Sequence, residues 1–138
     1  MTAPQRLTER KREAILQAAI VEFRSSGFEV TSMDKIAATA GVSKRTVYNH
    51  FPSKEELFAE ILNRLWHSIT ADQEMAYNPL EPLREQLRRL LQAKLQLLSE
   101  NNFLDLARIA IAATIHSPER AQDMVSRMGQ REEGLTTW

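Results

Sequence analysis

Cysteine is absent from this chain of 138 residues, and glycine is scarce, with four in all. Without cysteine the chain has neither a disulfide framework nor a thiolate metal site. No glycine-rich phosphate loop, HExxH pattern or nucleophile at a recognisable spacing from a base is present, which argues against an enzyme. His67 and His116 lie far apart in the sequence without partners at metal-ligand spacing, so we expect no metal and no other cofactor.

Long apolar runs are also missing. The longest such stretch, residues 104–115, is interrupted by Asp105 and Arg108 and is shorter than a membrane span. The N-terminus is polar and basic and lacks the apolar segment of a signal peptide. The sequence therefore predicts no membrane segment and a cytoplasmic location.

An excess of charge of one sign is lacking overall, because the formal net charge is zero. The charges are nevertheless unevenly placed: the first 52 residues carry eight basic side chains against five acidic ones, whereas residues 71–138 carry eight against ten. The basic character therefore belongs to the front of the chain. This modest bias is compatible with a nucleic-acid partner but does not establish one.

Apolar residues recur at steps of three and four in most of the chain, and no segment alternates apolar and polar residues as a strand would. An all-α fold is therefore predicted. The expected helices run from Thr8 to Ser26, from Thr31 or Ser32 to Ala40, from Ser43 to about His50, from Ser53 to the low seventies, from Leu83 to Leu98, from Phe103 to Ile115, and from Ser117 onward.

Local signals support several of these helix starts. Thr31 with Asp34, and Ser53 with Glu56, have the spacing of capping boxes, and Ser43 is placed to cap the third helix. Two prolines between residues 75 and 82 mark a loop between two halves. We expect a DNA-binding domain in residues 1–52, a connecting helix to about residue 74, and a second helical domain in residues 75–138. Helix 103–115 is apolar nearly all round, which predicts that other helices enclose it.

The second and third helices flank a three-residue turn of Gly41, Val42 and Ser43. This is the spacing of a helix-turn-helix, whose second helix enters the major groove of DNA. Helical periodicity turns Val47 and Phe51 inward. The outward residues are Lys44, Arg45, Tyr48 and Asn49, which include side chains suited to guanine and adenine edges.

The front of the chain, over about residues 10–65, resembles the N-terminal domain of the TetR family of transcriptional regulators. The resemblance rests on Ile15-Leu16, Ala18-Ala19, Phe23, Gly27-Phe28, Thr31, Ile36-Ala37, Ala40-Gly41-Val42-Ser43, Val47-Tyr48, Phe51, Ser53-Lys54 and Leu57-Phe58. It implies a three-helix DNA-binding domain followed by an all-helical domain that binds a small effector and forms a homodimer on a palindromic operator. Repression relieved by the effector is the expected mode, although activators also occur in the family.

The expected DNA contacts lie in and around the helix-turn-helix. They are Thr31, Ser32, Ser43, Lys44, Arg45, Tyr48, Asn49, His50 and Lys54. Six of them have an ordinary structural alternative: Ser43 as a helix cap, Lys44 and Arg45 as solvated charges, Tyr48 as cover for the core edge, and Asn49 and His50 as solvent-facing residues. Lys54 opposes the dipole of the helix that it begins, which favours a nearby phosphate.

The back half carries weaker signals. The resemblance implies an effector pocket among the fourth to seventh helices, which would use Trp66, Phe103, Arg108, Ile111 and Met124. Aromatic and methionine side chains at helical spacing also serve as ordinary core. Arg108 is expected to pair with Asp105 one turn earlier, with binding of an anionic effector as the alternative.

Two further expectations concern the whole chain. Family members are commonly longer, and the final Leu-Thr-Thr-Trp carries no helix stop signal, so the chain reads as truncated. Its dimer should then form poorly, with an apolar face of the last three helices exposed. The alternative function is a helical protein-interaction module that has lost DNA binding, against which Lys44 and Arg45 argue.

Overall fold

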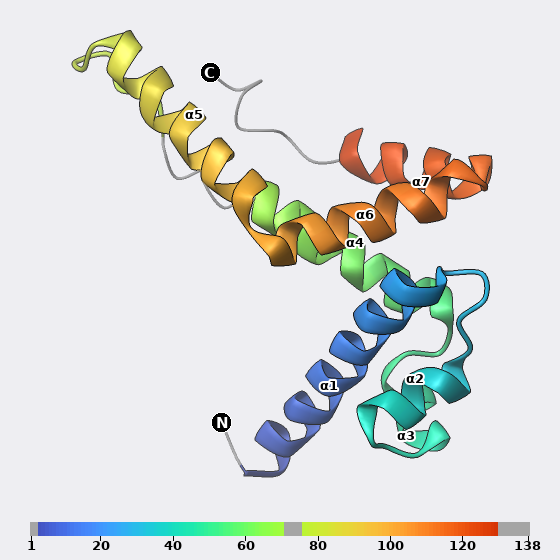
Figure 1. Cartoon of the computed structure of the whole chain (residues 1–138). Helices are drawn as coiled ribbons and strands as arrows, with labels where there is room; N and C mark the ends of the chain where they lie inside the picture. Colours follow the sequence, from blue (N-terminus) through green and yellow to red (C-terminus); the bar gives the residue numbers. More distant parts are fainter. Residues whose placement is uncertain (1–2, 71–75, 130–138) are drawn as a thin grey trace.

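The computed structural model describes residues 3–70 and 76–129, and within these ranges it contains seven α-helices and no strand (Figure 1). The predicted all-α fold is therefore confirmed. The helices are α1 (Ala3–Ser26), α2 (Met33–Ala40), α3 (Lys44–His50), α4 (Lys54–Thr70), α5 (Leu83–Ser99), α6 (Asn101–Ile115) and α7 (Pro118–Gly129). The end of the connecting helix near residue 74, part of the predicted domain boundary and the C-terminal Leu-Thr-Thr-Trp lie outside the described residues.

The helix ends follow local chemistry. Gly27 and Gly41 end α1 and α2 with φ of 86° and 70°, a left-handed conformation that glycine adopts without a Cβ clash. Ser43 Oγ accepts a hydrogen bond from the Thr46 amide at 3.1 Å, and Ser53 Oγ accepts one from the Glu56 amide at 3.2 Å. Both predicted serine caps are thus confirmed.

The capping box predicted for Thr31 and Asp34 is wrong. Ser32 is the N-cap of α2, and its hydroxyl accepts a hydrogen bond from the Lys35 amide at 3.1 Å. The Thr31 hydroxyl instead donates to the carbonyl of Gly27 at 2.7 Å. Either Thr31 or Ser32 could cap α2. Because the Thr31 side chain is buried and bonds Gly27, Ser32 takes this position.

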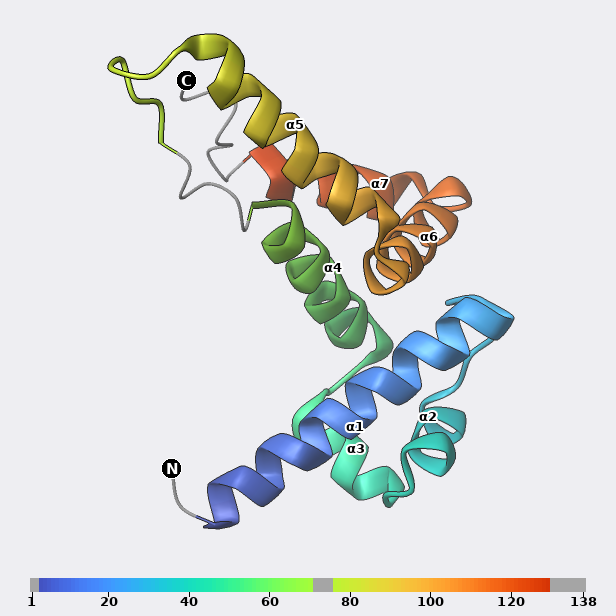
Figure 2. The same ribbon diagram turned by 60° about the vertical axis from the view of Figure 1, so that its left-hand side comes forward.

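One hydrophobic core joins the two halves of the chain. Ile15, Leu16 and Ala19 of α1 pack in the same cluster as Leu57 and Ile61 of α4. The cluster continues into α6 through Leu106, Ile109, Ala110 and Ala113. As Figures 1 and 2 show, α2 and α3 lie beside α1 at one end of the molecule, while α5 lies toward the opposite end and α7 lies beside α6.

Two sequence expectations about α6 are wrong. Other helices do not enclose it, because Ile111 and Ile115 are 58% and 67% exposed. Asp105 does not pair with Arg108; its carboxylate accepts a hydrogen bond from Arg24 of α1 at 3.2 Å. The contact between α1 and α6 brings Arg24 to this carboxylate, while Arg108 remains exposed.

Helix α5 presents an apolar row to solvent. Gln86 and Leu90 are its buried residues. The exposed leucines of α5 are Leu83, Leu87, Leu91, Leu95 and Leu98. Ile111 and Ile115 of α6 and Val125 of α7 are exposed as well.

Candidate nucleic-acid interface and ligand cavity

Helix α3 is held on the molecule by a small number of buried side chains. Val47 has no exposed surface and Phe51, just after the helix, is 2% exposed, so both predicted inward residues are confirmed. The left-handed Gly41 allows the amide of Val42 to bond the carbonyl of Ala37 at 3.1 Å, which fixes the turn between α2 and α3. The opposite face of α3 is left free of the core.

That opposite face carries donors. Arg45, Tyr48 and Asn49 are exposed, with 43% of Tyr48 accessible. Lys44 is also exposed, but its ammonium forms an ion pair with Asp34 of α2 at 3.0 Å, and this hydrogen bond raises the pKa of Lys44. A contact between Lys44 and DNA would require this ion pair with Asp34 to break. Ser43 stands at the N-terminus of the same helix, also exposed.

His50 ends α3 and is half-buried. Its burial, and then the nearby charges of Arg12 and Lys11, lower the pKa of His50. The side chain is accordingly neutral at pH 7, with one ring nitrogen as donor and the other as acceptor. Arg12 donates a hydrogen bond to the backbone carbonyl of His50 at 3.2 Å, so α1 directly holds the end of α3.

Three residues expected at the DNA lie elsewhere or have other partners. Thr31 is only 3% exposed and its hydroxyl donates to the Gly27 carbonyl, so its side chain is withdrawn from the surface, and its contact with DNA stays a prediction. Ser32 is exposed at the N-cap of α2. The Lys54 ammonium donates to the carbonyls of Phe28 and Glu29 at 2.9 and 3.2 Å. These carbonyls account for a cation at the start of α4 without a phosphate.

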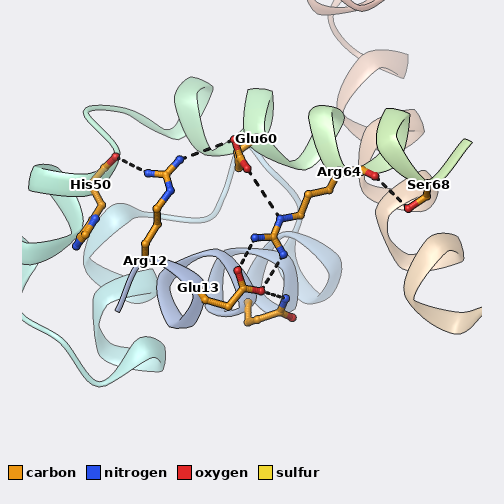
Figure 3. A network of polar contacts seen from close by, with 7 residues as sticks. Arg12, Glu13, His50, Glu60, Arg64 and Ser68 are labelled. Atoms are coloured by element: carbon orange, nitrogen blue, oxygen red, sulfur yellow. Dashed lines mark hydrogen bonds and ion pairs between the residues drawn. The ribbon is translucent and has the colours of Figure 1, made fainter. Parts of the chain in front are cut away.

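A polar network ties α4 to α1 (Figure 3). Arg64 of α4 donates to both carboxylate oxygens of Glu13, with the Nη1 to Oε1 distance at 2.8 Å. These bonds lower the pKa of Glu13 and raise that of Arg64. The Nη2 atom of Arg12 lies 3.8 Å from Oε2 of Glu60 in α4. The guanidinium carbon of Arg12 stacks 4.2 Å from the centre of the Phe51 ring. Since Arg12 also holds His50, this network joins α1, α3 and α4.

A cavity of about 210 Å³ lies between α4, α6 and α7. Its lining is almost entirely apolar, and the lining residues are Leu62, Asn63, Leu65, Trp66, Ile69, Phe103, Ala107, Ala110, Ile111, Met124 and Arg127. Four residues expected in an effector pocket, Trp66, Phe103, Ile111 and Met124, thus meet at one cavity. Arg108 does not line it and is wrongly placed there, because it projects from the exposed side of α6.

A second, larger hollow of about 500 Å³ lies between α1, α4 and α6 and includes Gln17, Arg64, His67 and Asn102 in its lining. Its lining mixes polar and apolar groups, and Arg64 already donates hydrogen bonds to Glu13. An apolar cavity with few polar groups is the more usual site for a small organic ligand.

Comparison with known proteins agrees with the helix-turn-helix geometry. Residues 15–61 match the model of the bacterial regulatory proteins of the tetR family, and residues 85–138 match the C-terminal domain of AefR-like transcriptional repressors. Together the two matches span most of the chain. This chain belongs to the TetR family.

Individual relatives agree with the TetR assignment. A TetR-family regulator from Pseudomonas syringae pv. tomato has a solved structure that is 60% identical, with a TM-score of 0.77, over 88% of this chain and 61% of that one. The transcriptional regulator YhgD of Bacillus subtilis is 37% identical over 62% of this chain and 45% of its own length. The transcriptional activator FasR of Mycolicibacterium smegmatis is 28% identical over 92% of this chain and 62% of its own. The chain thus spans about half to two thirds of these relatives.

The TetR family is one of transcriptional regulators rather than enzymes. Within the described residues no cluster of three or more His, Asp or Glu side chains could hold a metal ion. In the same part of the chain, no helix has the length and apolar character needed to cross a bilayer.

Sequence reasoning missed the residues that connect this TetR fold internally. Arg64 and Glu13 are 51 positions apart, and Arg120 of α7 bonds Glu29 across 91 positions. No spacing between neighbouring residues in the sequence predicts such pairs. Arg127 of the cavity follows Met124 by three positions, so helical periodicity alone would have placed it on the same face.

Proposed function

We propose that this protein regulates transcription by binding a palindromic operator as a homodimer through α3, and that it is a repressor released by a small effector. The exposed donor face of α3, fixed from beneath by Val47 and Phe51, carries this proposal. A rigid helix that presents arginine, tyrosine and asparagine to solvent suits the major groove.

Each α3 residue has a role in this proposal. Arg45 is placed to donate to guanine O6 and N7, and Asn49 to pair with adenine. The Tyr48 and Ser43 hydroxyls would donate to phosphates, which position the helix without reading sequence. Ser32 at the start of α2, Lys44 and His50 complete the expected contact surface. Lys54 would contribute to DNA binding by fixing the loop before α2 through its hydrogen bonds to that loop, rather than by contacting a phosphate.

The homodimer follows from the geometry of operator reading. One α3 reads one half-site, whereas two copies related by a two-fold axis read a palindrome. A second copy would also cover part of the leucine row on α5. Exposed apolar surface of this kind is typical of a protein-protein contact.

We propose that the effector is a small apolar molecule with one negatively charged end. The apolar lining around Trp66 and Phe103 suits a hydrophobic body. Arg127 is the one charged side chain among the described lining residues, and it now pairs with Asp123 at 3.1 Å. An anionic group on a ligand would compete with Asp123 for that guanidinium. The match of residues 85–138 to the C-terminal domain of AefR-like transcriptional repressors supports the repressor role.

A fluorescence anisotropy titration tests DNA binding. The DNA is a labelled duplex from the promoter region of the protein's own gene, with a scrambled duplex of equal length as control, at two salt concentrations. We expect tighter binding to the promoter duplex and weaker binding at high salt, because phosphate contacts release counterions. Equal affinity for both duplexes would reject sequence-specific regulation, and no binding to either would favour the interaction module.

A further inference from the structure

The loop between α1 and α2 carries an aromatic ring with a cation against it from each of two helices. The ammonium of Lys54, at the start of α4, lies 4.8 Å from the centre of the Phe28 ring. The guanidinium carbon of Arg120, from α7, lies 4.1 Å from the same centre. We name Phe28, Glu29, Lys54 and Arg120 the Phe28 clamp. Helices from the front and the back of the chain meet in it.

Hydrogen bonds reinforce both sides of the Phe28 clamp. Lys54 donates to the carbonyls of Phe28 and Glu29. Arg120 donates to the Glu29 carboxylate, which lowers the pKa of Glu29 and keeps it charged at neutral pH. Arg120 also reaches the Ala113 carbonyl at 3.4 Å. Only 22% of its side chain is exposed, so this arginine is ordered against the loop rather than extended into water.

One face of α7 contacts both the loop before α2 and the apolar cavity. Arg120, Met124 and Arg127 follow one another at steps of four and three, so their side chains project from the same side of the helix. Arg120 contacts the loop before α2, and Met124 and Arg127 line the apolar cavity. A displacement of α7 at the cavity therefore also acts on the loop.

We propose that Arg120 is a positioning residue that sets the orientation of α2 and α3 relative to the cavity-bearing helices, so that α7 transmits the state of the cavity to the DNA-binding face. This goes beyond the proposed function, which requires only that some helix respond to the ligand. The route differs from the network of α1, α3 and α4, because it runs through the loop before α2. It adds a second connection to the DNA-binding face.

The absence of cysteine makes the proposal directly measurable. Cysteines can be introduced at Ala38 of α2 and Ser126 of α7, which are both exposed. Spin labels then attach only at these two positions. The distance distribution between the two labels of one protomer is recorded without DNA, by double electron-electron resonance on labelled protein diluted with an excess of unlabelled protein. We expect one narrow distribution for the otherwise unchanged protein, a broader one for Arg120→Gln, and a nearly narrow one for Arg120→Lys, which keeps the positive charge. Arg108→Gln, the same change at an exposed arginine of α6, is the matched control.

DNA binding by the unlabelled variants supplies the functional readout. Arg120→Gln should weaken promoter binding roughly 3- to 10-fold, the scale expected for loss of a coupling residue, while its melting temperature stays close to that of Arg108→Gln. An unchanged distance distribution in Arg120→Gln would overturn the proposal, as would a broadened one with unaltered DNA affinity. Failure of the unsubstituted protein to bind any DNA would reject the proposed function, and the label distances would still decide the role of Arg120.

The cavity side of the proposal needs no ligand for its test. Met124→Trp places extra volume in the cavity, whereas Val125→Trp adds the same ring at an exposed position of α7. We expect Met124→Trp to shift or broaden the label distribution and Val125→Trp to leave it unchanged. If Met124→Trp does not fold, Met124→Phe repeats the test with a smaller ring. An unaltered distribution in a folded Met124 variant would exclude transmission through α7.

Discussion

Arg64 of α4 donates hydrogen bonds to both carboxylate oxygens of Glu13 of α1, with the Nη1 to Oε1 distance at 2.8 Å. The pair connects α1, which packs beside α2 and α3, to α4, which also lines the apolar cavity (Figure 3). A bidentate arginine-carboxylate contact fixes direction as well as distance, because the two planar groups must face each other. The pair therefore favours the orientation in which the apolar core packs α4 on α1.

Arg64→Gln should lower the free energy of unfolding by about 0.5 to 1 kcal/mol at pH 7, since both side chains are partly exposed and solvent screens the pair. The pKa of Glu13 is lowered in the fold. Its contribution is thus present above the ordinary glutamate pKa and is lost as the pH falls through the folded-state pKa.

Urea denaturation of the unsubstituted protein and Arg64→Gln at pH 7 and near pH 3 measures this contribution. The difference between the two proteins should shrink at the lower pH. Arg88→Gln removes a more exposed pair with Glu85 and serves as the control. A difference that is the same at both pH values would show that Glu13 is not the titrating partner.

Arg45→Ala should reduce the preference for one operator base pair by about 1 to 3 kcal/mol, the discrimination of a bidentate contact to guanine. Tyr48→Phe should instead weaken binding to promoter and scrambled DNA alike, because a phosphate contact carries no sequence information. Competition assays with single-base operator variants separate the two effects. Equal losses of Arg45→Ala on operator and scrambled DNA would remove its base-reading role.

Thr31→Val should destabilise the fold by about 1 to 2 kcal/mol, since it removes a buried hydroxyl that donates to a backbone carbonyl. Operator sequence preference should not change, because this side chain does not reach the surface. Thr39→Val is a matched control: its hydroxyl donates to Glu22 at 2.8 Å at an exposed site, and its loss should cost less. A changed sequence preference in folded Thr31→Val would place Thr31 among the DNA contacts.

Arg127→Gln should remove the preference of the cavity for an anionic ligand. Octanoate, 1-octanol and octylamine share one apolar chain and differ in the charge of the head group. We expect octanoate to bind most tightly by calorimetry, and Arg127→Gln to bring its affinity to that of 1-octanol. Arg108→Gln should leave the order unchanged. Octanoate binding that is equal in the unsubstituted protein and Arg127→Gln would show that the cavity does not select through this arginine.

The sequence by itself determined the features that depend on neighbours along the chain. Helical periodicity and the serine caps at Ser43 and Ser53 placed the helices, and Gly41 with Val42 and Ser43 marked the turn before α3. Val47 and Phe51 were predicted inward because a helix of known period leaves them on one face. Trp66, Phe103, Ile111 and Met124 were grouped through resemblance to a family, since no local spacing connects residues on three separate helices.

Only the tertiary structure decided which polar groups meet across the fold. Asp105 has Arg108 nearby in sequence, yet the packing of α1 on α6 brings Arg24 to it instead. Lys54 faces carbonyls of the loop before α2, and Arg120 reaches the Phe28 ring from far along the chain. Polar contacts of this kind are weak and long-range in sequence, so no local preference encodes them. The apolar core first brings the helices together, and the charged side chains then take the partners that this packing leaves within reach.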